Sequence, residues 1–332
     1  MKRNRVTGLV LAAGLALAAS GCGSDSGAAE SSGASGGGSL EPVTLAILKL
    51  GAMANVDYAQ KEGFFADHGL EVEIVEVSAQ NLPTVIQADQ ADIGLFIPGT
   101  GMVANEQGAG LVAVWQNETA GAEAPGSNAI MVPTGSDIKE LADLAGKRVG
   151  ISAARGQGYA ALQTILDQEG VSIDELELVE APFDTMAPML ASDQLDAAIT
   201  LDPYTTQIQQ EGNGKPLSYY MIDVLPNQVV GAFWAKESWL ADHSDEAQAF
   251  QAALKEASDA LNEDDALGRK AVAEYSGLPA DLVDAMPPIS WDYTVDVEVW
   301  QAIADMMTKT GEMKEEHDAS DYLSAELMEY AK

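Results

Sequence analysis

Short apolar runs alternate with helical patterns along the first two thirds of this chain, and several of the runs end in loops of small residues. The run 149–151 is the clearest example, since a loop follows it and a helical pattern starts at Gly158. Such alternation is typical of an α/β fold with mainly parallel sheets, whose ligands bind at the carboxyl ends of the strands. We therefore expect four loops to lie together. They follow Leu48, Ile97, Ile151 and Leu201.

Hydrophobic periodicity and turn residues predict the individual elements. The predicted strands span residues 43–48, 71–77, 93–97, 111–115, 129–132, 149–151, 176–179, 197–200 and 229–234. The predicted helices span residues 55–68, 82–88, 137–144, 186–191, 245–261, 266–275, 280–285, 295–310 and 320–330, with one more from 158 onward. In the helix 137–144, Asp137 and Glu140 stand at capping-box spacing. The C-terminal run of helices is expected to cover a sheet formed earlier in the chain.

One short motif occurs twice. Asp89-Gln90-x-Asp92 and Asp193-Gln194-x-Asp196 each lie between a predicted helix and an apolar strand that ends in a Pro-containing loop. The repeat indicates two similarly built α/β halves.

The N-terminus has the features of an export signal. A basic start precedes an apolar run over residues 6–19, which is too short to span a membrane. Ala19-Ser20-Gly21-Cys22 resembles a bacterial lipobox, although Ala19 stands where Leu is usual. We predict a lipoprotein signal peptide over residues 1–21, a lipid on Cys22 and a flexible Gly/Ser tether over residues 22–40. Cys22 is the only cysteine, so no internal disulfide can form.

The formal net charge is −35. Binding to nucleic acid depends on basic residues that neutralise phosphates, so this charge argues against a nucleic-acid partner.

The loop after the run 149–151 has the character of one wall of a small-molecule site. Its small residues let a ligand approach the backbone, and the first amides of the following helix favour an anion or a polar oxygen. Arg155 adds a guanidinium at this place. The alternative is an ordinary turn between strand and helix, with Arg155 in solvent.

An ordered set of motifs resembles a known family. The motifs are Tyr58-Ala59-x-x-x-Gly63-Phe64-Phe65-x-x-x-Gly69-Leu70-x-Val72, Ala91-Asp92-Ile93-Gly94, Asp143-Leu144-x-Gly146-Lys147-x-Val149-Gly150, Leu195-Asp196-Ala197 and Asp202-Pro203. They are similar in order to motifs of the substrate-binding proteins of ABC importers for nitrate, taurine, alkanesulfonates and the pyrimidine precursor of thiamine. The resemblance covers roughly residues 43–234.

This resemblance implies a two-lobed type 2 periplasmic binding protein fold, with a ligand cleft between lobes. Lobe I is expected at 41–128 plus 231–332 and lobe II at 129–230, with hinges near 129–132 and 229–232. The implied partners are an importer permease and its ATPase, with no cofactor, no metal and no catalytic residue. The implied ligand-binding residues are Asn55, Tyr58, Gly99, Thr100, Trp115, Asn117, Ser152, Arg155, Gly156, Gln157, Gly158, Asp202 and Tyr204.

The chemistry of these residues leaves two ligand classes open. Arg155 at a helix start favours an anion such as a sulfonate, and a zwitterion such as taurine would also use Asp202. A heteroaromatic compound such as a thiamine pyrimidine precursor is the alternative, with the predicted aromatic residues as flat walls. Each of those aromatic residues is equally consistent with core packing, and Asp202 is equally consistent with a helix cap.

An enzyme is the more distant alternative. Gly156-x-Gly158-x-x-Ala161 matches a dinucleotide-binding pattern, but four residues separate Ile151 from Gly156 where a tight turn is expected. The three histidines stand far apart in the sequence and form no metal-binding motif. The sequence therefore favours binding without chemistry.

Overall fold

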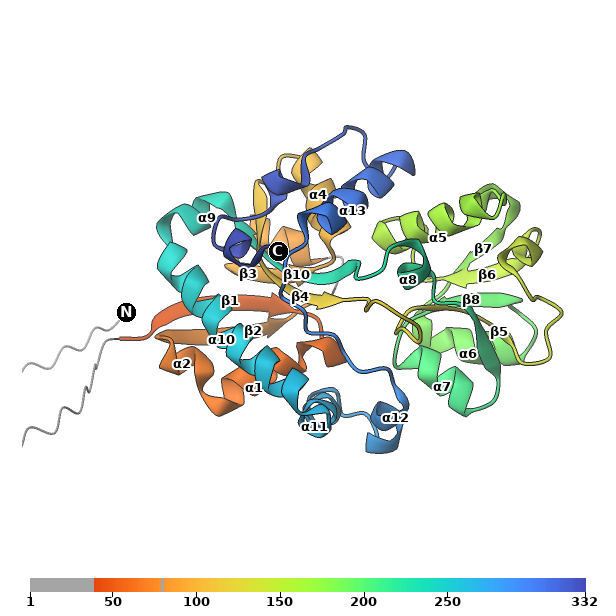
Figure 1. Cartoon of the computed structure of the whole chain (residues 1–332), viewed down its shortest axis with the longest axis horizontal. Coiled ribbons are helices and arrows are strands. Elements are labelled where there is room, and N and C mark those ends of the chain that lie inside the picture. Colours follow the sequence, from red (N-terminus) through yellow and green to blue (C-terminus); the bar gives the residue numbers. More distant parts are fainter. Residues whose placement is uncertain (1–38, 79–80) are drawn as a thin grey trace, which may run out of the picture. The chain divides into compact units, whose positions relative to one another are not determined.

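The structure is a computed structural model that describes residues 39–78 and 81–332. The predicted signal peptide, Cys22 and nearly all of the predicted tether lie outside these residues. Two five-stranded sheets, each covered by helices, make up the described part (Figure 1). We call the first sheet with its helices lobe I, and the second sheet with its helices lobe II.

The sheet of lobe I has the strand order β2-β1-β3-β10-β4. Its strands are β1 (Glu41–Ile47), β2 (Leu70–Glu76), β3 (Ile93–Phe96), β4 (Leu111–Thr119) and β10 (Val229–Lys236). The helices of this lobe are α1 (Ala54–Glu62), α2 (Phe64–Asp67), α3 (Leu82–Gln87), α4 (Pro98–Glu106), α9 (Glu237–Asp242), α10 (Ser244–Glu263), α11 (Asp265–Ser276), α12 (Ala280–Ala285) and α13 (Val297–Lys309). Short 3-10 turns lie at η1 (Gly51–Met53), η5 (Ala319–Tyr322) and η6 (Leu327–Tyr330).

The sheet of lobe II has the order β7-β6-β8-β5-β9. Its strands are β5 (Ala129–Pro133), β6 (Arg148–Ile151), β7 (Glu177–Glu180), β8 (Ala197–Thr200) and β9 (Gly214–Ser218). Its helices are α5 (Gln157–Gln168), α6 (Phe183–Ala191), α7 (Tyr204–Gln210) and α8 (Tyr220–Val224), with 3-10 turns η3 (Leu141–Leu144) and η4 (Ile173–Glu175).

The two sheets are built alike, as the repeated motif predicted. In each sheet three strands pair in parallel, and one strand, β10 or β5, runs antiparallel to both of its neighbours. The last Asp of each copy of the motif accepts a hydrogen bond from a backbone amide of a neighbouring strand. Asp92 Oδ2 accepts a hydrogen bond from the Thr44 amide at 2.8 Å, and Asp196 Oδ2 accepts one from the Arg148 amide at 2.9 Å.

Three predicted elements differ in the structure. The segment 98–101, expected to be a loop, begins α4, because Pro98 stands at the start of a helix where its missing N–H is not needed. The helix predicted over 137–144 is reduced to η3, whose capping box joins Glu140 and Asp143. The helix predicted over 320–330 is two 3-10 turns, because Ser324 between them donates its amide to Ala113 O on β4 at 3.0 Å.

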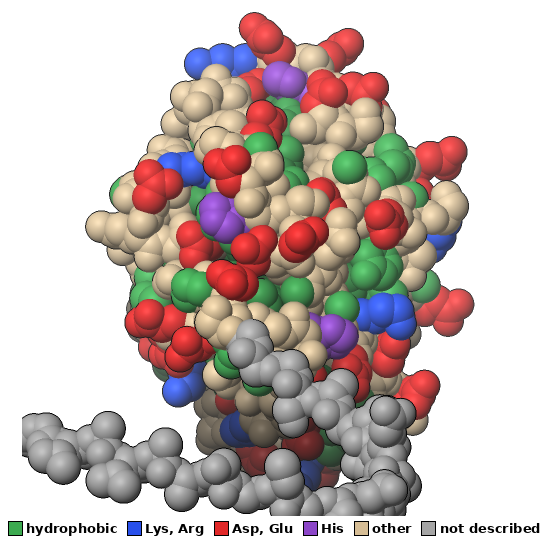
Figure 2. Space-filling model, turned by 90° about the vertical axis from the view of Figure 1, so that its left-hand side faces the viewer, with side chains coloured by type: hydrophobic (Ala, Val, Ile, Leu, Met, Phe, Trp, Pro, Cys, Tyr) green, Lys and Arg blue, Asp and Glu red, His purple; other side chains and the backbone are tan. Residues whose placement is uncertain are grey.

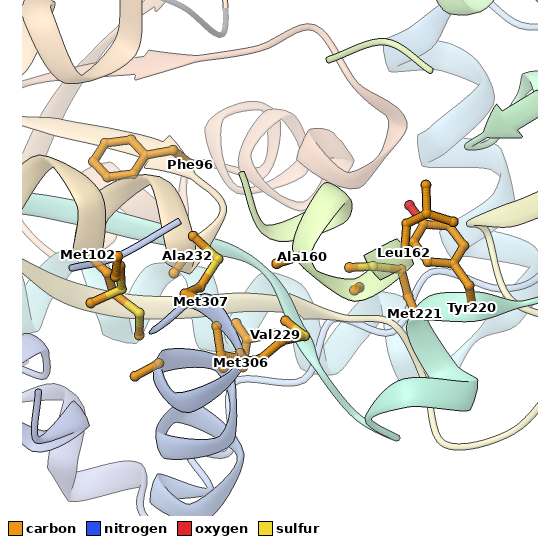
Figure 3. Packing of buried hydrophobic residues seen from close by; sticks show 14 of the residues in the cluster. Phe96, Met102, Ala160, Leu162, Tyr220, Met221, Val229, Ala232, Met306 and Met307 are labelled. Carbon is orange, nitrogen blue, oxygen red and sulfur yellow. The ribbon is translucent and has the colours of Figure 1, made fainter. Parts of the chain in front are cut away.

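The largest hydrophobic cluster contains buried residues of both lobes. In Figure 3, Met102 of α4 and Met307 of α13 lie near Ala232 of β10, and Ala160 of α5 lies further along the same cluster. Helix α5 of lobe II therefore packs against helices of lobe I, which fixes where its first residues lie.

Acidic side chains are spread over the face shown in Figure 2, with histidine side chains apart from one another among them. Among residues 39–78 and 81–332, no helix is both long and apolar enough to cross a membrane.

Candidate ligand-binding site

A cavity of about 610 Å³ is lined by residues of both lobes. Its walls include Gly51 after β1, Thr100 after β3, Ser152 after β6 and Asp202 after β8. The four loops thus meet, as predicted from the rule that ligands bind at the carboxyl ends of parallel strands. The segment that joins β4 to β5 and the loop 286–290 supply further wall. The volume is typical of a site for a small organic molecule.

The loop after β6 passes into α5 at Gly156. Its φ of 85° lies in the region that favours glycine, so the sharp entry to the helix needs this residue. The Gly156 amide donates a hydrogen bond to Glu312 Oε2 at 2.6 Å. Glu312 follows α13, so the start of this lobe II helix faces a carboxylate of lobe I. The anion site that the sequence predicted here already contains an anionic group of the protein.

Gln157 is almost completely buried at the same junction. Its Oε1 accepts a hydrogen bond from the Gly99 amide at 2.9 Å, and its Nε2 donates to Gln228 Oε1 and to Val229 O, both at 2.8 Å. These contacts join α5 to α4 and β10. They use the hydrogen-bonding capacity that the sequence assigned to a ligand, so Gln157 acts as a bridge between the lobes in this structure.

Glu118 near the end of β4 faces the cavity and was missed from the sequence. It is partly buried, and burial raises the pKa of its carboxyl group from 4.5 to about 7. No residue in the described ranges donates a hydrogen bond to this carboxylate. One signal in the sequence could have indicated it, namely an acidic residue three positions after the apolar run 111–115.

Asp202 makes the capping contact that the sequence allowed, with one of its two carboxylate oxygens. Its Oδ1 accepts a hydrogen bond from the Thr206 amide at 2.9 Å in the first turn of α7, which is a capping contact. Its Oδ2 is buried and has no hydrogen-bond partner among residues 39–78 and 81–332. Burial raises the pKa of Asp202, against the hydrogen bonds from Thr206, which lower it. A buried carboxylate oxygen without a donor costs free energy that a ligand N–H can recover.

Arg155 lies on the wall of the cavity, with an exposed side chain. It also lines a neighbouring cavity of about 740 Å³, together with Thr100, Gly156 and Glu312. No salt bridge of Arg155 occurs within the described part of the chain. Among the described residues, Arg155 is the only charged residue that lines both cavities.

The structure brings about half of the predicted site residues to the cavity wall. These are Thr100, Ser152, Arg155, Gly156, Gln157, Gly158 and Asp202. Gly99 lines the neighbouring cavity instead.

The other predicted residues lie elsewhere. Asn55 and Asn117 are buried and bonded to each other, with 2.8 Å between Asn55 Nδ2 and Asn117 Oδ1. Trp115 is fully buried and stacks on Tyr293 at 5.0 Å between ring centroids. Tyr58 packs edge-on against Phe64. These four residues support the fold around the site and do not line the cavity in this conformation.

Three other aromatic residues line the cavity, namely Tyr159, Phe183 and Tyr220. Tyr204, predicted as a wall, lies behind one of them, with its ring stacked on Phe183 at 6.2 Å. Flat apolar walls are thus present, but they come from these three residues and not from the aromatic residues that the sequence predicted. No pattern in the sequence separates these aromatic residues from core residues.

No group of three or more His, Cys, Asp or Glu side chains in the described ranges is arranged to hold a metal ion. The described wall of the cavity also contains no His or Cys. Its ionisable side chains are mainly carboxylates, namely Glu118, Glu123 and Asp202, with Arg155 as the single Lys or Arg.

Comparison with known sequences identifies relatives of this chain. The family model described as "NMT1/THI5 like" matches residues 52–266. A "Putative thiamine biosynthesis protein" of Haemophilus influenzae is 32% identical over 146 residues, which are 44% of this chain and 45% of that protein. A "Putative binding protein" of Brucella abortus is 24% identical over 209 residues, 60% of each protein. The chain thus spans about half the length of the curated relatives it matches.

Solved structures share the fold. The alkanesulfonate-binding protein SsuA of Xanthomonas axonopodis pv. citri, bound to MOPS, has a TM-score of 0.71 at 20% identity, covering 86% of this chain and 99% of that one. The periplasmic aliphatic sulphonate binding protein SsuA of Escherichia coli has a TM-score of 0.72 at 20% identity, covering 86% and 98%. The "desulfurization enzyme DSZB" is also similar, with a TM-score of 0.66 at 14% identity, covering 87% and 98%.

These similarities confirm the resemblance that the motifs indicated. The family match covers most of the chain, and the structural neighbours share its two-sheet architecture. The chain belongs to the NMT1/THI5-like family and has the two-lobed α/β fold of the periplasmic binding proteins.

Proposed function

We propose that this protein is an extracytoplasmic solute-binding receptor that captures a small organic solute in the 610 Å³ cavity and delivers it to an ABC importer. The permease and the ATPase of that importer would be its partners. A cavity at the strand ends of two similar lobes supports this proposal, as does the fold shared with the sulfonate-binding proteins. A lipid on Cys22 would hold the receptor at the membrane.

The proposed division into lobes follows the sequence prediction, with lobe I at 41–128 plus 231–332 and lobe II at 129–230. The distribution of strands supports it, because β1 to β4 and β10 form one sheet and β5 to β9 form the other.

A binding role is favoured over a catalytic one by the side chains at the cavity. Two hydroxyl groups on the wall bind each other, with a hydrogen bond from Thr119 Oγ1 to Ser290 Oγ at 3.1 Å. General bases and activated nucleophiles are usually paired within hydrogen-bond reach, and the described wall offers no such pair.

We propose that the solute carries N–H groups or a positive charge, as in a heteroaromatic amine related to the pyrimidine precursor of thiamine. The buried, unpartnered Oδ2 of Asp202 carries this proposal, because it needs a donor. Glu118 offers a second acceptor on the same cavity. The rings of Tyr159, Phe183 and Tyr220 would provide flat surfaces for an aromatic ligand.

A sulfonate or a zwitterion such as taurine, the first expectation from the sequence, is the second candidate. Arg155 on the cavity wall favours it. We rank it second because Glu312 already accepts the hydrogen bond of the Gly156 amide, and because carboxylates outnumber cations on the wall.

Isothermal titration calorimetry with two variants separates the two candidates. A hydroxymethyl aminopyrimidine should bind the wild-type protein, and Asp202→Asn should weaken it about tenfold to a hundredfold, the loss expected for one hydrogen bond to a charged group. Arg155→Ala should leave this affinity unchanged. The control is Asp184→Asn, which removes an exposed carboxylate of α6 outside the cavity wall. Binding of taurine that depends on Arg155 would instead establish the second candidate.

A further inference from the structure

A side chain of lobe I, Glu312, accepts a hydrogen bond from the backbone at the start of α5. Glu312 lies in the segment after α13, and its Oε2 is 2.6 Å from the Gly156 amide nitrogen, next to the first residue of the helix. A carboxylate at this place interacts favourably with the amides and with the positive end of the helix dipole. Glu312 therefore occupies the position that the acidic group of a ligand would take.

A second set of contacts keeps the two groups at this distance. Gln157 binds the Gly99 amide and Val229 O, so the start of α5 is fixed against α4 and β10. Packing at Gly99 is equally tight, because a Cβ added there would lie 2.9 Å from Met307 Cε. With α5 and α13 held in this way, Glu312 has a fixed partner.

Glu312 also lies next to the ligand-binding cavity. Glu312 and Arg155 line the neighbouring cavity, and Arg155 and Gly156 line both cavities. The nearby negative charge of Glu312 contributes to the raised pKa of Tyr159, after the larger effects of burial and of Asp174. An anion that approached Arg155 from the ligand cavity would thus meet the field of a fixed carboxylate.

We propose that Glu312 is a specificity-determining residue, a built-in anion that excludes sulfonates, sulfate and other anionic solutes from the amide of Gly156 and from Arg155. This inference rests on the proposed function, in which the cavity serves a nitrogen-bearing solute. In the fold shared with sulfonate-binding proteins, the same helix start would be open to an anion once this carboxylate is absent.

The test measures the affinity of the purified protein for sulfate and for butanesulfonate by calorimetry, before and after substitution of Glu312. Glu312→Ala frees the Gly156 amide and removes the charge, and we expect a gain of about tenfold or more in anion affinity. Glu312→Gln removes the charge but keeps an acceptor, so its gain should be smaller. Combining Glu312→Ala with Arg155→Ala should reduce the gain, because only the Gly156 amide then remains to bind the anion.

Glu316→Gln is the matched control, because it removes an equal charge from the same segment at an exposed position outside both cavity walls. Circular dichroism of each variant verifies that it is folded. Equal anion affinity in wild type, Glu312→Gln and Glu312→Ala would overturn the inference, and so would an equal gain in Glu316→Gln.

The same titrations distinguish this inference from the proposed function. Binding of the aminopyrimidine to wild type tests the function, and the gain of anion binding in the Glu312 variants tests the role of Glu312. If wild type binds neither class but Glu312→Ala gains anions, the inference stands and the proposed ligand is wrong. If wild type already binds butanesulfonate through Arg155, both are wrong.

Discussion

Replacement of Glu118 by glutamine should stabilise the protein at neutral and alkaline pH. Glu118 lies on β4 opposite Gly231 of β10, where a Cβ added to the glycine would be 3.7 Å from Glu118 Oε2. The side chain is partly buried at the cavity wall, and burial raises the pKa of its carboxyl group from 4.5 to about 7. The folded protein therefore holds this proton over a pH range in which the unfolded chain has lost it.

The pKa difference sets the sign and size of the effect. Between the unfolded pKa of 4.5 and the folded pKa of about 7, the folded state binds more protons than the unfolded state, so the free energy of unfolding falls as pH rises. Each pKa unit corresponds to about 1.4 kcal/mol, so the loss amounts to about 3 kcal/mol. Glu118→Gln has no proton to lose and removes this component of the pH dependence.

Urea unfolding of both proteins at several pH values measures the difference directly. Other ionisable groups are common to the two proteins, so their contributions largely cancel. We expect Glu118→Gln to be more stable by about 3 kcal/mol at about pH 8.5 and to lose this advantage below about pH 5. Glu123→Gln, at an exposed position on the same cavity, is the control. A difference that does not change with pH would refute the reasoning.

Two further predictions concern the junction of the lobes, both measured by urea unfolding. Gln157→Ala leaves the buried Gly99 amide and Val229 O without their partner, so it should cost about 2–4 kcal/mol, whereas Gln168→Ala, at the exposed end of α5, should change little. Gly99→Ala places a Cβ 3.0 Å from Cβ of the buried Gln157 and 2.9 Å from Met307 Cε, so it should cost about 1–3 kcal/mol. Wild-type stability in either variant would show that the junction is looser than described.

Much of the fold could be predicted from the sequence because apolar runs and turn residues act locally. The repeat around Asp92 and Asp196 identified two similar halves, and the rule that ligands bind at the carboxyl ends of parallel strands gathered the correct loops. The segment 98–101 was mistaken for a loop because Pro and Gly suit both a turn and the first turn of a helix.

The site was harder to predict because its polar contacts join distant parts of the chain. Trp115 and Asn117 belong to a strand that reaches the site, but the sequence does not reveal which residues of the strand line the cavity. Gly156 and Glu312 are 156 positions apart in the sequence, so no local pattern predicts their contact. The residues around the helix start therefore could not show that Glu312 also lies there.

Thermal unfolding of the purified protein with single solutes tests most directly whether the cavity is a receptor site for a nitrogen-bearing solute. The panel contains the aminopyrimidine, taurine, butanesulfonate and nitrate. A ligand at about 100 times its Kd adds about 2.7 kcal/mol and should raise the melting temperature by about 4 °C. We predict this rise with the aminopyrimidine and its loss in Asp202→Asn. A rise with the sulfonate or nitrate alone would contradict the proposal.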